Sequence, residues 1–346
     1  MTEEDARTPP APAETAPAVT VMDVARAAGV SVSTVSRIVN GTARVADDKR
    51  RAVEEAIARL DYRPNLHARS LKMGTSMTIG VLTQDIESPV FNRILLAVEE
   101  TLKNTGYAPI IVSGHWNKEE EAERARLLMA RRIDGLVVLN GGLSDQQLRE
   151  FSKRQPVVAT GRSLEGPNLK AMRLDNEQGG YLATKHLLSL GHRRIAHISG
   201  TTTHADALDR YAGYARALKE HGIPLDPNII FQGDFQENGG ALAMTRLLDS
   251  GQPFTAVFAA NDQSAMGARM VLYRRGIRVP EDISLMGYDN LPVTAYLTPP
   301  LTTIHQPLYE MGRFLASSLL RMLGKPAEEI ELPDMTLVVR ETVKRR

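Results

Sequence analysis

The chain has 346 residues, of which 42% are hydrophobic and 24% are charged, an ordinary composition for a globular protein of two or three domains. It contains no cysteine, which excludes a disulfide framework, a cysteine zinc site and thiol catalysis. No apolar run approaches the roughly 18–20 residues that cross a bilayer, and the N-terminus does not resemble an export signal. We therefore expect a cytoplasmic protein with no membrane partner.

The net charge of +1 is unevenly distributed along the chain. Residues 1–18 are rich in Pro and Ala, carry a net charge of −3 and show no apolar periodicity, which predicts a disordered tail. Residues 19–73 carry ten Lys/Arg against six acids, whereas the remaining 273 residues balance at 31 against 31. A short cationic segment is typical of a module that binds a polyanion. A solvent-exposed helical face with no such partner can carry the same excess of basic residues.

Residues 19–63 predict three short helices. Thr20 caps the first, Gly29 supplies the positive φ of a sharp turn, Ser31 caps the second, and the third is expected at about 47–60. Apolar residues at helical spacing predict the core of this bundle: Val21, Val24, Ala25, Ala28, Val35, Ile38, Val39, Val53, Ile57 and Leu60. Two short helices joined by a Gly turn are typical of a helix-turn-helix, although unrelated helical hairpins share the pattern.

The segment that follows the three helices predicts a linker with one short helix. Pro64 disfavours helix in the residue before it, Asn65 can cap a helix over 66–72, and Gly74 ends that helix. An isolated helix of about eight residues is marginal in water.

From residue 77 onward the pattern alternates strand and helix. Strands are expected at 78–83, 109–113, 135–140, 157–160, 194–199, 228–231, 256–260 and 283–286, and the short segment 172–174 leads into a helix. Helices are expected at 91–104, 118–132, 177–190, 211–221, 239–250, 264–275 and 308–323, and a further helix is expected between the strands at 135–140 and 157–160. Regular alternation predicts parallel sheets covered by helices, and this length suits two lobes better than one.

Several motifs follow one another over about residues 19–340: Val19-Thr20-xx-Asp23-Val24-Ala25-xxx-Gly29-Val30-Ser31-xx-Thr34-Val35-Ser36-Arg37, Tyr62-Arg63-Pro64-Asn65-xx-Ala68-Arg69-x-Leu71, Ile79-Gly80-Val81, Leu190-Gly191-His192-Arg193, Arg210-xx-Gly213-Tyr214, Ala260-Asn261-Asp262, Gly287-Tyr288-Asp289 and Leu301-Thr302-Thr303-Ile304. In this order and spacing the sequence resembles the lactose/galactose repressor family of bacterial transcription regulators.

The resemblance implies a homodimer in which each subunit has an all-α helix-turn-helix headpiece (19–63), a hinge helix and linker (64–76), and an α/β core of two periplasmic-binding-protein-like lobes with parallel sheets (77–346). In that fold the chain crosses between the lobes three times. The lobes are therefore expected at about 77–175 with 307–332, and at about 176–304 with 333–346.

The resemblance also implies that the second headpiece helix enters the major groove of double-stranded operator DNA. Base edges are expected to meet Val32, Ser33 and Arg37, of which Arg37 can donate a bidentate pair to guanine. The residues suited to phosphate contacts are Ser31, Thr34, Ser36, Asn40 and Arg44. A role in capping the helix explains the presence of Ser31 and Thr34 at these positions equally well.

The hinge helix is expected to read the minor groove. Leu71 matches the family's leucine that wedges into the operator centre, and Ala68 lies one turn earlier on the same face. Wedging unstacks a base step at a cost of a few kcal/mol, and the resulting bend brings more DNA into contact. The alternative is that Leu71 packs on the core domain.

In open α/β sheets, ligands bind beyond the carboxyl ends of the strands. The residues that match family positions there are Phe91, Arg162, His204, Asp206, Arg210, Phe235, Asn261, Asp289 and Gln306. Carboxylates and amides bind paired hydroxyls and an aromatic face covers sugar C–H groups, so the set suits a monosaccharide or a derivative. An Arg210–Asp289 salt bridge with no ligand role is the alternative reading.

These features predict an effector-responsive, sequence-specific transcriptional regulator that needs no cofactor or metal, favoured as a dimeric repressor of a palindromic operator at the nucleoid. The residues Gln232-Gly233-Asp234-Phe235 are also similar to purine-responsive members, which keeps a purine co-repressor as the alternative. Those members tend to have Arg where this chain has His204, which weakens that alternative.

Two other classes of protein compete with a regulator. An enzyme is disfavoured because the sequence has no Gly-x-Ser-x-Gly, Gly-x-Gly-x-x-Gly or Walker loop. A sugar-transport binding protein would need an export signal and would have no use for residues 19–73.

Overall fold

The computed structural model describes residues 19–40, 45–62 and 74–346, and it divides into two units, residues 1–76 and 77–346. The expected N-terminal tail and hinge helix lie outside the described residues. Within the described part of the chain, no helix has the length and apolar character needed to span a bilayer.

The first unit contains the expected helix-turn-helix. Its helices are α1 (Val21–Ala28), α2 (Val32–Asn40) and α3 (Asp47–Arg59). Thr20 and Asp23 form a reciprocal capping box before α1, and Gly29 ends it with φ +65°. Val24 and Ala25 of α1, Val35 of α2, and Val53 and Ala56 of α3 form a shared buried core. Burial of these residues fixes which face of α2 remains exposed.

The first lobe of the second unit is built on a mostly parallel sheet with strand order β2-β1-β3-β4-β6-β5. The strands are β1 (Thr78–Thr83), β2 (Ala108–Ser113), β3 (Gly135–Val138), β4 (Val157–Thr160), β5 (Leu164–Gly166) and β6 (Leu169–Met172). The helices are α5 (Pro89–Leu102), α6 (Lys118–Ala130) and α7 (Asp145–Ser152). Only β5 runs antiparallel to its neighbour among these described strands, and the sequence pattern did not predict it.

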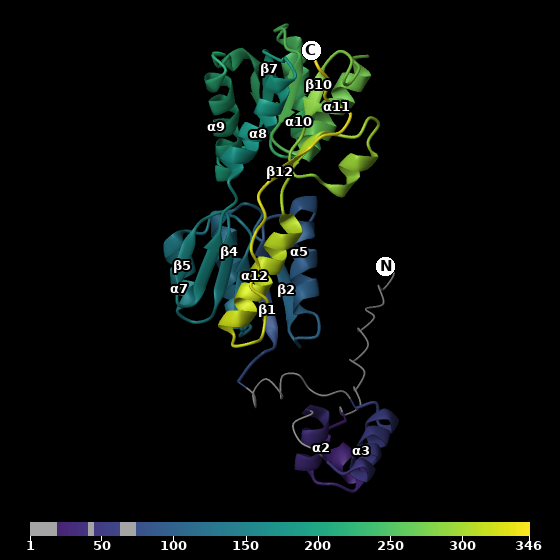
Figure 1. Cartoon of the computed structure of the whole chain (residues 1–346). Coiled ribbons are helices and arrows are strands. Elements are labelled where there is room, and N and C mark those ends of the chain that lie inside the picture. The colour runs from purple at the N-terminus through teal and green to yellow at the C-terminus, as the bar shows by residue number, and fades with distance from the viewer. Residues whose placement is uncertain (1–18, 41–44, 63–73) are drawn as a thin grey trace, which may run out of the picture. The chain divides into compact units, whose positions relative to one another are not determined.

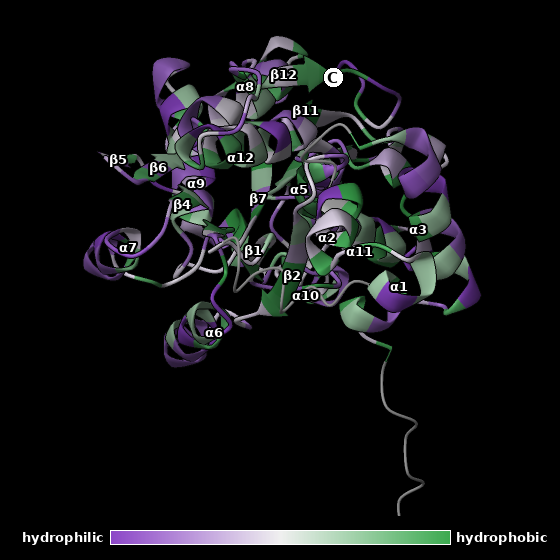
Figure 2. Cartoon of the chain, turned by 90° about the horizontal axis from the view of Figure 1, so that it is seen from below, coloured by the Kyte–Doolittle hydropathy of each residue, from purple (hydrophilic) through white to green (hydrophobic). Residues whose placement is uncertain are grey.

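Two buried clusters cover the two faces of this sheet. One contains residues of α5 and the later helix α12, and the other contains residues of α6 and α7. The strands β1, β3 and β4 are buried along almost their whole length, as expected for a sheet covered on both faces. Figure 2 shows α7 as largely hydrophilic, in keeping with its place on the outside of the lobe.

The second lobe has a four-stranded parallel sheet with order β10-β9-β7-β8. Its strands are β7 (Ile195–Ser199), β8 (Ile230–Gln232), β9 (Ala256–Ala259) and β10 (Ser284–Met286). Its helices are α8 (Asn176–Ser189), α9 (Ala205–Glu220), α10 (Glu237–Asp249) and α11 (Asp262–Arg274), with short 3-10 turns at Pro227–Ile229 and Pro292–Tyr296. Helices α8 and α9 pack together, as do α10 and α11.

The chain passes between the two lobes three times. It leaves the first lobe after β6, returns after β11 (Thr303–His305) to form α12 (Leu308–Met322), and then passes back to β12 (Thr336–Val338). Helix α12 packs beside α5 in the first lobe, whereas β12 pairs antiparallel with β11 (Figure 1). Effector-sized clefts form between lobes joined in this way.

Candidate functional site

The exposed face of α2 is the candidate DNA-binding surface of the first unit. Ser31, Val32, Ser33 and Arg37 are exposed, and Val32 keeps 42% of its surface accessible although it is apolar. Ser31 acts as a cap, because its Oγ accepts from the Thr34 backbone N–H at 3.2 Å and pairs with the Thr34 hydroxyl at 2.8 Å. The N-terminal end of a helix is also where phosphates bind, so this capping role is compatible with the predicted phosphate contact.

The other residues expected to contact DNA are placed as follows. Thr34 and Ser36 are half-buried on α2. The side chain of Asn40 lies outside the described part of the structure, as do Arg44, Ala68 and Leu71.

The second unit has a cavity between its two lobes, which we call the inner cavity. It holds about 880 Å³ of space that is partly open to solvent. Many of its lining residues lie within three residues of the carboxyl end of a parallel strand: Asp85, Trp116, Asn140, Gly161 and Leu174 in the first lobe, and Asp234, Phe235, Asn261 and Asp289 in the second. This is where ligands bind in open α/β sheets.

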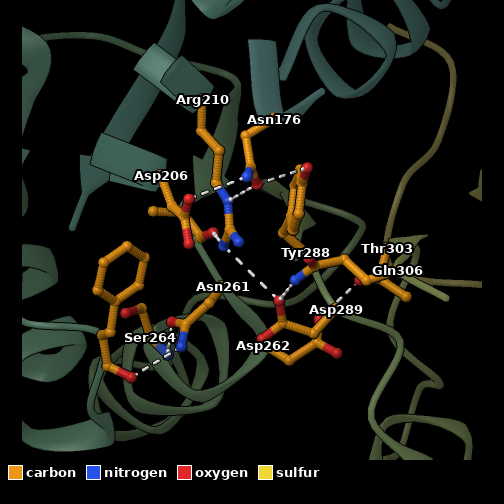
Figure 3. Close-up of polar contacts among 12 residues, drawn as sticks. Asn176, Asp206, Arg210, Asn261, Asp262, Ser264, Tyr288, Asp289, Thr303 and Gln306 are labelled. Atoms are coloured by element: carbon orange, nitrogen blue, oxygen red, sulfur yellow. Dashed lines mark hydrogen bonds and ion pairs between the residues drawn. The ribbon is translucent and has the colours of Figure 1, made fainter. Parts of the chain in front are cut away.

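Arg210 on α9 is the central cation of the inner cavity (Figure 3). It is only 4% exposed, and its Nε donates to Asn176 Oδ1 at 3.0 Å while Nη1 donates to the Ala260 carbonyl at 2.6 Å. Nη1 also lies 3.6 Å from Asp289 Oδ1, and the guanidinium stacks 3.8 Å from the Tyr288 ring centroid. The salt bridge considered from the sequence therefore exists, and both of its members line the cavity.

Asp289 has one carboxylate oxygen that is free to accept. Oδ1 accepts from Gln306 Nε2 at 2.6 Å, whereas Oδ2 is buried and receives no hydrogen bond from the described residues. Burial raises the pKa of Asp289 to about 6, against the opposing effect of Arg210. Burial also raises the pKa of the neighbouring Asp262, whose oxygens accept from Thr303 Oγ1 and the Leu291 N–H. A buried acceptor without a donor favours a ligand that supplies one.

Asp206 joins the two lobes at the rim of the inner cavity. Its Oδ1 accepts from Asn176 Nδ2 and its Oδ2 accepts from Asn140 Nδ2, both at 3.1 Å. Asn140 belongs to the first lobe and is itself oriented by Thr160 Oγ1, which donates to Asn140 Oδ1 at 2.6 Å. The Asn140–Asp206 bond is thus a direct polar contact between the lobes.

Four aromatic rings cross from one lobe to the other along the cavity. Phe91 lies 6.0 Å from Trp116, Trp116 stacks on His204 at 3.8 Å between ring centroids, and His204 is stacked 5.8 Å from Phe235. Phe91 and Trp116 come from the first lobe, and His204 and Phe235 from the second. Burial lowers the pKa of His204, which favours its neutral ring in this stack.

Comparison with known proteins identifies both units. Residues 76–344 match the model described as periplasmic binding proteins and sugar binding domain of LacI family, and residues 20–65 match that of bacterial regulatory proteins, lacI family. The chain belongs to the LacI family. It is therefore a transcriptional regulator with a helix-turn-helix DNA-binding domain and not an enzyme, which confirms the function and fold class predicted from the sequence.

Individual relatives cover nearly the whole chain. The transcriptional regulator GalR of Escherichia coli K12 is 38% identical over 328 residues, which are 94% of each chain. The repressor PurR of Vibrio atlanticus is 37% identical over 330 residues, covering 94% of this chain and 98% of its own. A lac repressor dimer solved with operator and the anti-inducer ONPF is 31% identical, with a TM-score of 0.83 over 94% of this chain and 99% of that one.

The inner cavity of this LacI-family chain brings together most of the residues selected from the sequence. Those that line it are Phe91, His204, Asp206, Arg210, Phe235, Asn261, Asp289 and Gln306. Arg162 does not line it, because its guanidinium donates to the Gly141 and Leu143 carbonyls in an adjoining space.

The lining residues that were not selected from the sequence include three polar or aromatic ones, Trp116, Asn140 and Asn176. Trp116 and Asn140 stand at the carboxyl ends of predicted strands, so the strand-end rule applied to every strand finds them. Within the described residues, no cluster of His, Asp or Glu is arranged to hold a metal ion.

Proposed function

We propose that this LacI-family regulator is a repressor that binds a palindromic operator as a homodimer and responds to a monosaccharide or sugar derivative in the inner cavity. The observation that carries the effector assignment is the buried Asp289 Oδ2, which lacks a donor among the described residues beside the Phe235 and Arg210 side chains. A sugar supplies hydroxyl donors for the carboxylate and a C–H face for the aromatic ring. The match to a family sugar-binding domain supports the same class of ligand.

On the DNA side, we assign base reading to Val32, Ser33 and Arg37, which share the exposed face of α2. Phosphate contacts are assigned to Ser31, Thr34, Ser36, Asn40 and Arg44. Leu71, with Ala68 beside it, is the proposed minor-groove wedge in a hinge at residues 64–76. Since the operator is chromosomal, the protein is expected to work in the cytoplasm, at the nucleoid.

Regulation follows from the position of the inner cavity between the lobes. A ligand that contacts both lobes biases their relative angle, and in a dimer that angle sets the spacing of the two hinges. Hinge helices of marginal stability then form or melt with the spacing. The ligand shifts this equilibrium only by the difference between its affinities for the two states.

A thermal-shift screen of the purified full chain against sugars and nucleobases tests the effector class. A ligand present at about 100 times its Kd adds about 2.7 kcal/mol to the free energy of unfolding. The sugar that raises the unfolding temperature should then change the affinity for an operator selected from random duplexes in a gel-shift assay. A chain that prefers no duplex sequence, with or without ligand, contradicts the proposal.

A purine co-repressor is the second candidate, supported by the 37% identity to PurR and by the flat aromatic rings of the cavity. His204 disfavours a purine ligand. Its neutral imidazole, which stacks on Trp116, has fewer hydrogen-bond donors for a nucleobase than the guanidinium of an Arg has. The same screen decides between the two, since stabilisation by guanine or hypoxanthine and by no sugar selects the purine.

A further inference from the structure

A second space adjoins the inner cavity on the far side of the Trp116–His204 stack, and we call it the outer chamber. It holds about 810 Å³, partly open to solvent. It shares Trp116, Asn140, Gly161, His204 and Asp206 with the inner cavity and adds Gly141, Gly142, Arg162, Thr203 and Ala205. The partition between the two spaces therefore consists of the Trp116–His204 stack and the Asn140–Asp206 hydrogen bond.

Both parts of this partition join one lobe to the other. Trp116 and Asn140 follow strands of the first lobe, whereas His204 and Asp206 lie at the start of α9 in the second. Separation of the lobes breaks both contacts and merges the two spaces. A ligand long enough to occupy both spaces can then replace them with contacts of its own.

The floor of the outer chamber is held rigidly by buried groups. The Glu121 carboxylate, fully buried, accepts from the Gly142 N–H at 2.8 Å and the Leu143 N–H at 3.1 Å. A Cβ at Gly141 would come within 2.6 Å of Glu121 Oε2. Any residue larger than glycine would therefore clash with the carboxylate at this position. Binding groups on a rigid floor lose little entropy when a ligand binds.

The chamber offers the mixture of groups that recognises a sugar ring. Trp116 is 42% exposed, its backbone N–H donates to Gln84 Oε1 at 3.2 Å, and its indole stacks on His204, which places an aromatic face at the chamber. Arg162 has a buried Nε with no acceptor among the described residues, and Asp206 and Asn140 supply acceptor and donor groups. Aromatic platforms with neighbouring hydroxyl partners suit an amphipathic ring.

The charges of the chamber disfavour an anionic ligand. Arg162 already pairs with Asp145 at 3.1 Å and lies near Glu121, and the Asp206 carboxylate faces the same space. A phosphate or carboxylate would meet this negative charge without a free cation to balance it. A neutral polyhydroxylated group has no such penalty.

We propose that the outer chamber is a second sugar subsite, so that the effector carries a further ring, joined by a glycosidic bond to the ring in the inner cavity, with Trp116 as the stacking platform. This inference rests on the proposed sugar response. It narrows the effector class from a simple monosaccharide to a disaccharide or glycoside. Trp116 acts in it as a specificity residue for the second ring.

Calorimetric titration of the full chain with matched sugars tests the inference: D-glucose against cellobiose and maltose, and D-galactose against lactose and melibiose. We expect one disaccharide to bind at least tenfold more tightly than its monosaccharide. Because Trp116 lines both spaces, Trp116→Ala should weaken disaccharide binding at least tenfold more than monosaccharide binding, and Trp116→Phe should retain most of the preference for the disaccharide. The half-exposed position of Trp116 makes these variants tolerable to the fold.

A filling variant provides an independent readout. Ala205 is exposed and lines only the outer chamber, so Ala205→Phe should reduce disaccharide affinity and spare the monosaccharide. In the wild type, the emission of Trp116, the single tryptophan of the chain, should shift more with the disaccharide than with the monosaccharide.

The outcomes separate this inference from the proposed function. Equal affinity for each disaccharide and its monosaccharide, or an equal loss of both in Trp116→Ala, overturns the second subsite and leaves the sugar response intact. Binding of nucleobases and of no sugar overturns the proposed effector class, and the second subsite with it.

Discussion

Replacement of Asp289 by Asn is the sharpest test of the inner cavity, because it removes one charge and keeps the shape of the side chain. Asp289 is 2% exposed, and an amide oxygen can keep the hydrogen bond from Gln306 that Oδ1 now accepts at 2.6 Å. What the change removes is the acceptor at Oδ2, which no described residue occupies. A hydrogen bond to a charged group contributes about 1.5–3 kcal/mol, so the sugar should bind about ten- to 150-fold more weakly.

The same substitution should leave the fold intact. Because burial raises the pKa of Asp289 to about 6, the folded state holds the proton more tightly than the unfolded state does. The stabilisation of the folded state by protonation of Asp289 therefore falls as the pH rises from about 4 to about 6. Above that range this stabilisation is absent. Arg210 keeps its bonds to Asn176 and the Ala260 carbonyl, so we expect thermal unfolding of the variant close to that of the wild type at about pH 8.

Titration calorimetry with the sugar found by the thermal-shift screen measures the effect, and a gel shift without sugar measures operator affinity. Asp249→Asn is the matched control, because Asp249 lies on the surface of the same lobe, paired with Arg275 at 2.9 Å. An Asp289→Asn protein that unfolds normally and binds the sugar as tightly as wild type refutes the assignment of Oδ2 to the ligand. Weakened operator binding without sugar would point to damage beyond the cavity instead.

Four further predictions concern the inner cavity, the residues assigned to DNA and the turn of the headpiece. Wild-type sugar affinity should fall up to about tenfold between about pH 7 and pH 5 as the Asp289 carboxylate is protonated, and calorimetry should show a flatter profile for Asp289→Asn. Arg37→Ala should weaken binding to the specific operator by about 1–3 kcal/mol in gel shifts. Binding to random duplex should weaken by less than that. Leu71→Ala should weaken operator binding with ligand affinity nearly unchanged, whereas equal operator affinity would defeat the hinge model. Gly29→Ala should destabilise the headpiece by about 1–2 kcal/mol, read by hydrogen exchange, because Gly29 has φ +65° with open space around it.

Much of the fold could be predicted because its elements are long and periodic. The buried strand β1 was predicted at its observed bounds, Thr78–Thr83, and the helices of both units were predicted within a few residues, apart from the early start of α9 at Ala205. The strands β5, β11 and β12 were missed, since each has three residues and too little alternation to stand out. They are defined by pairing with distant partners, as Thr303 with Val338, which periodicity does not reveal.

The site was predictable to the extent that strand ends determine it. Asn261 and Asp289 lie within three residues of the ends of β9 and β10, and the topology of a parallel sheet brings such positions together. Arg162 also follows a strand end, but its side chain turns to the Gly141 carbonyl, and the choice between cavity and loop depends on packing that one sequence does not encode locally. The Trp116–His204 stack joins residues far apart in the chain and was likewise beyond local patterns.

In the proposed function, the groups assigned to effector binding are distinct from the groups that respond to movement of the lobes. The Arg210–Ala260 and Gln306–Asp289 hydrogen bonds do not involve the first-lobe sheet, so they do not depend on contact between the lobes. The Asn140–Asp206 bond and the Trp116–His204 stack exist only when the lobes are close. Because coupling to DNA requires a difference in affinity between two arrangements, we expect the rim contacts to carry the regulation and the wall of the second lobe to carry most of the affinity for the ring in the inner cavity.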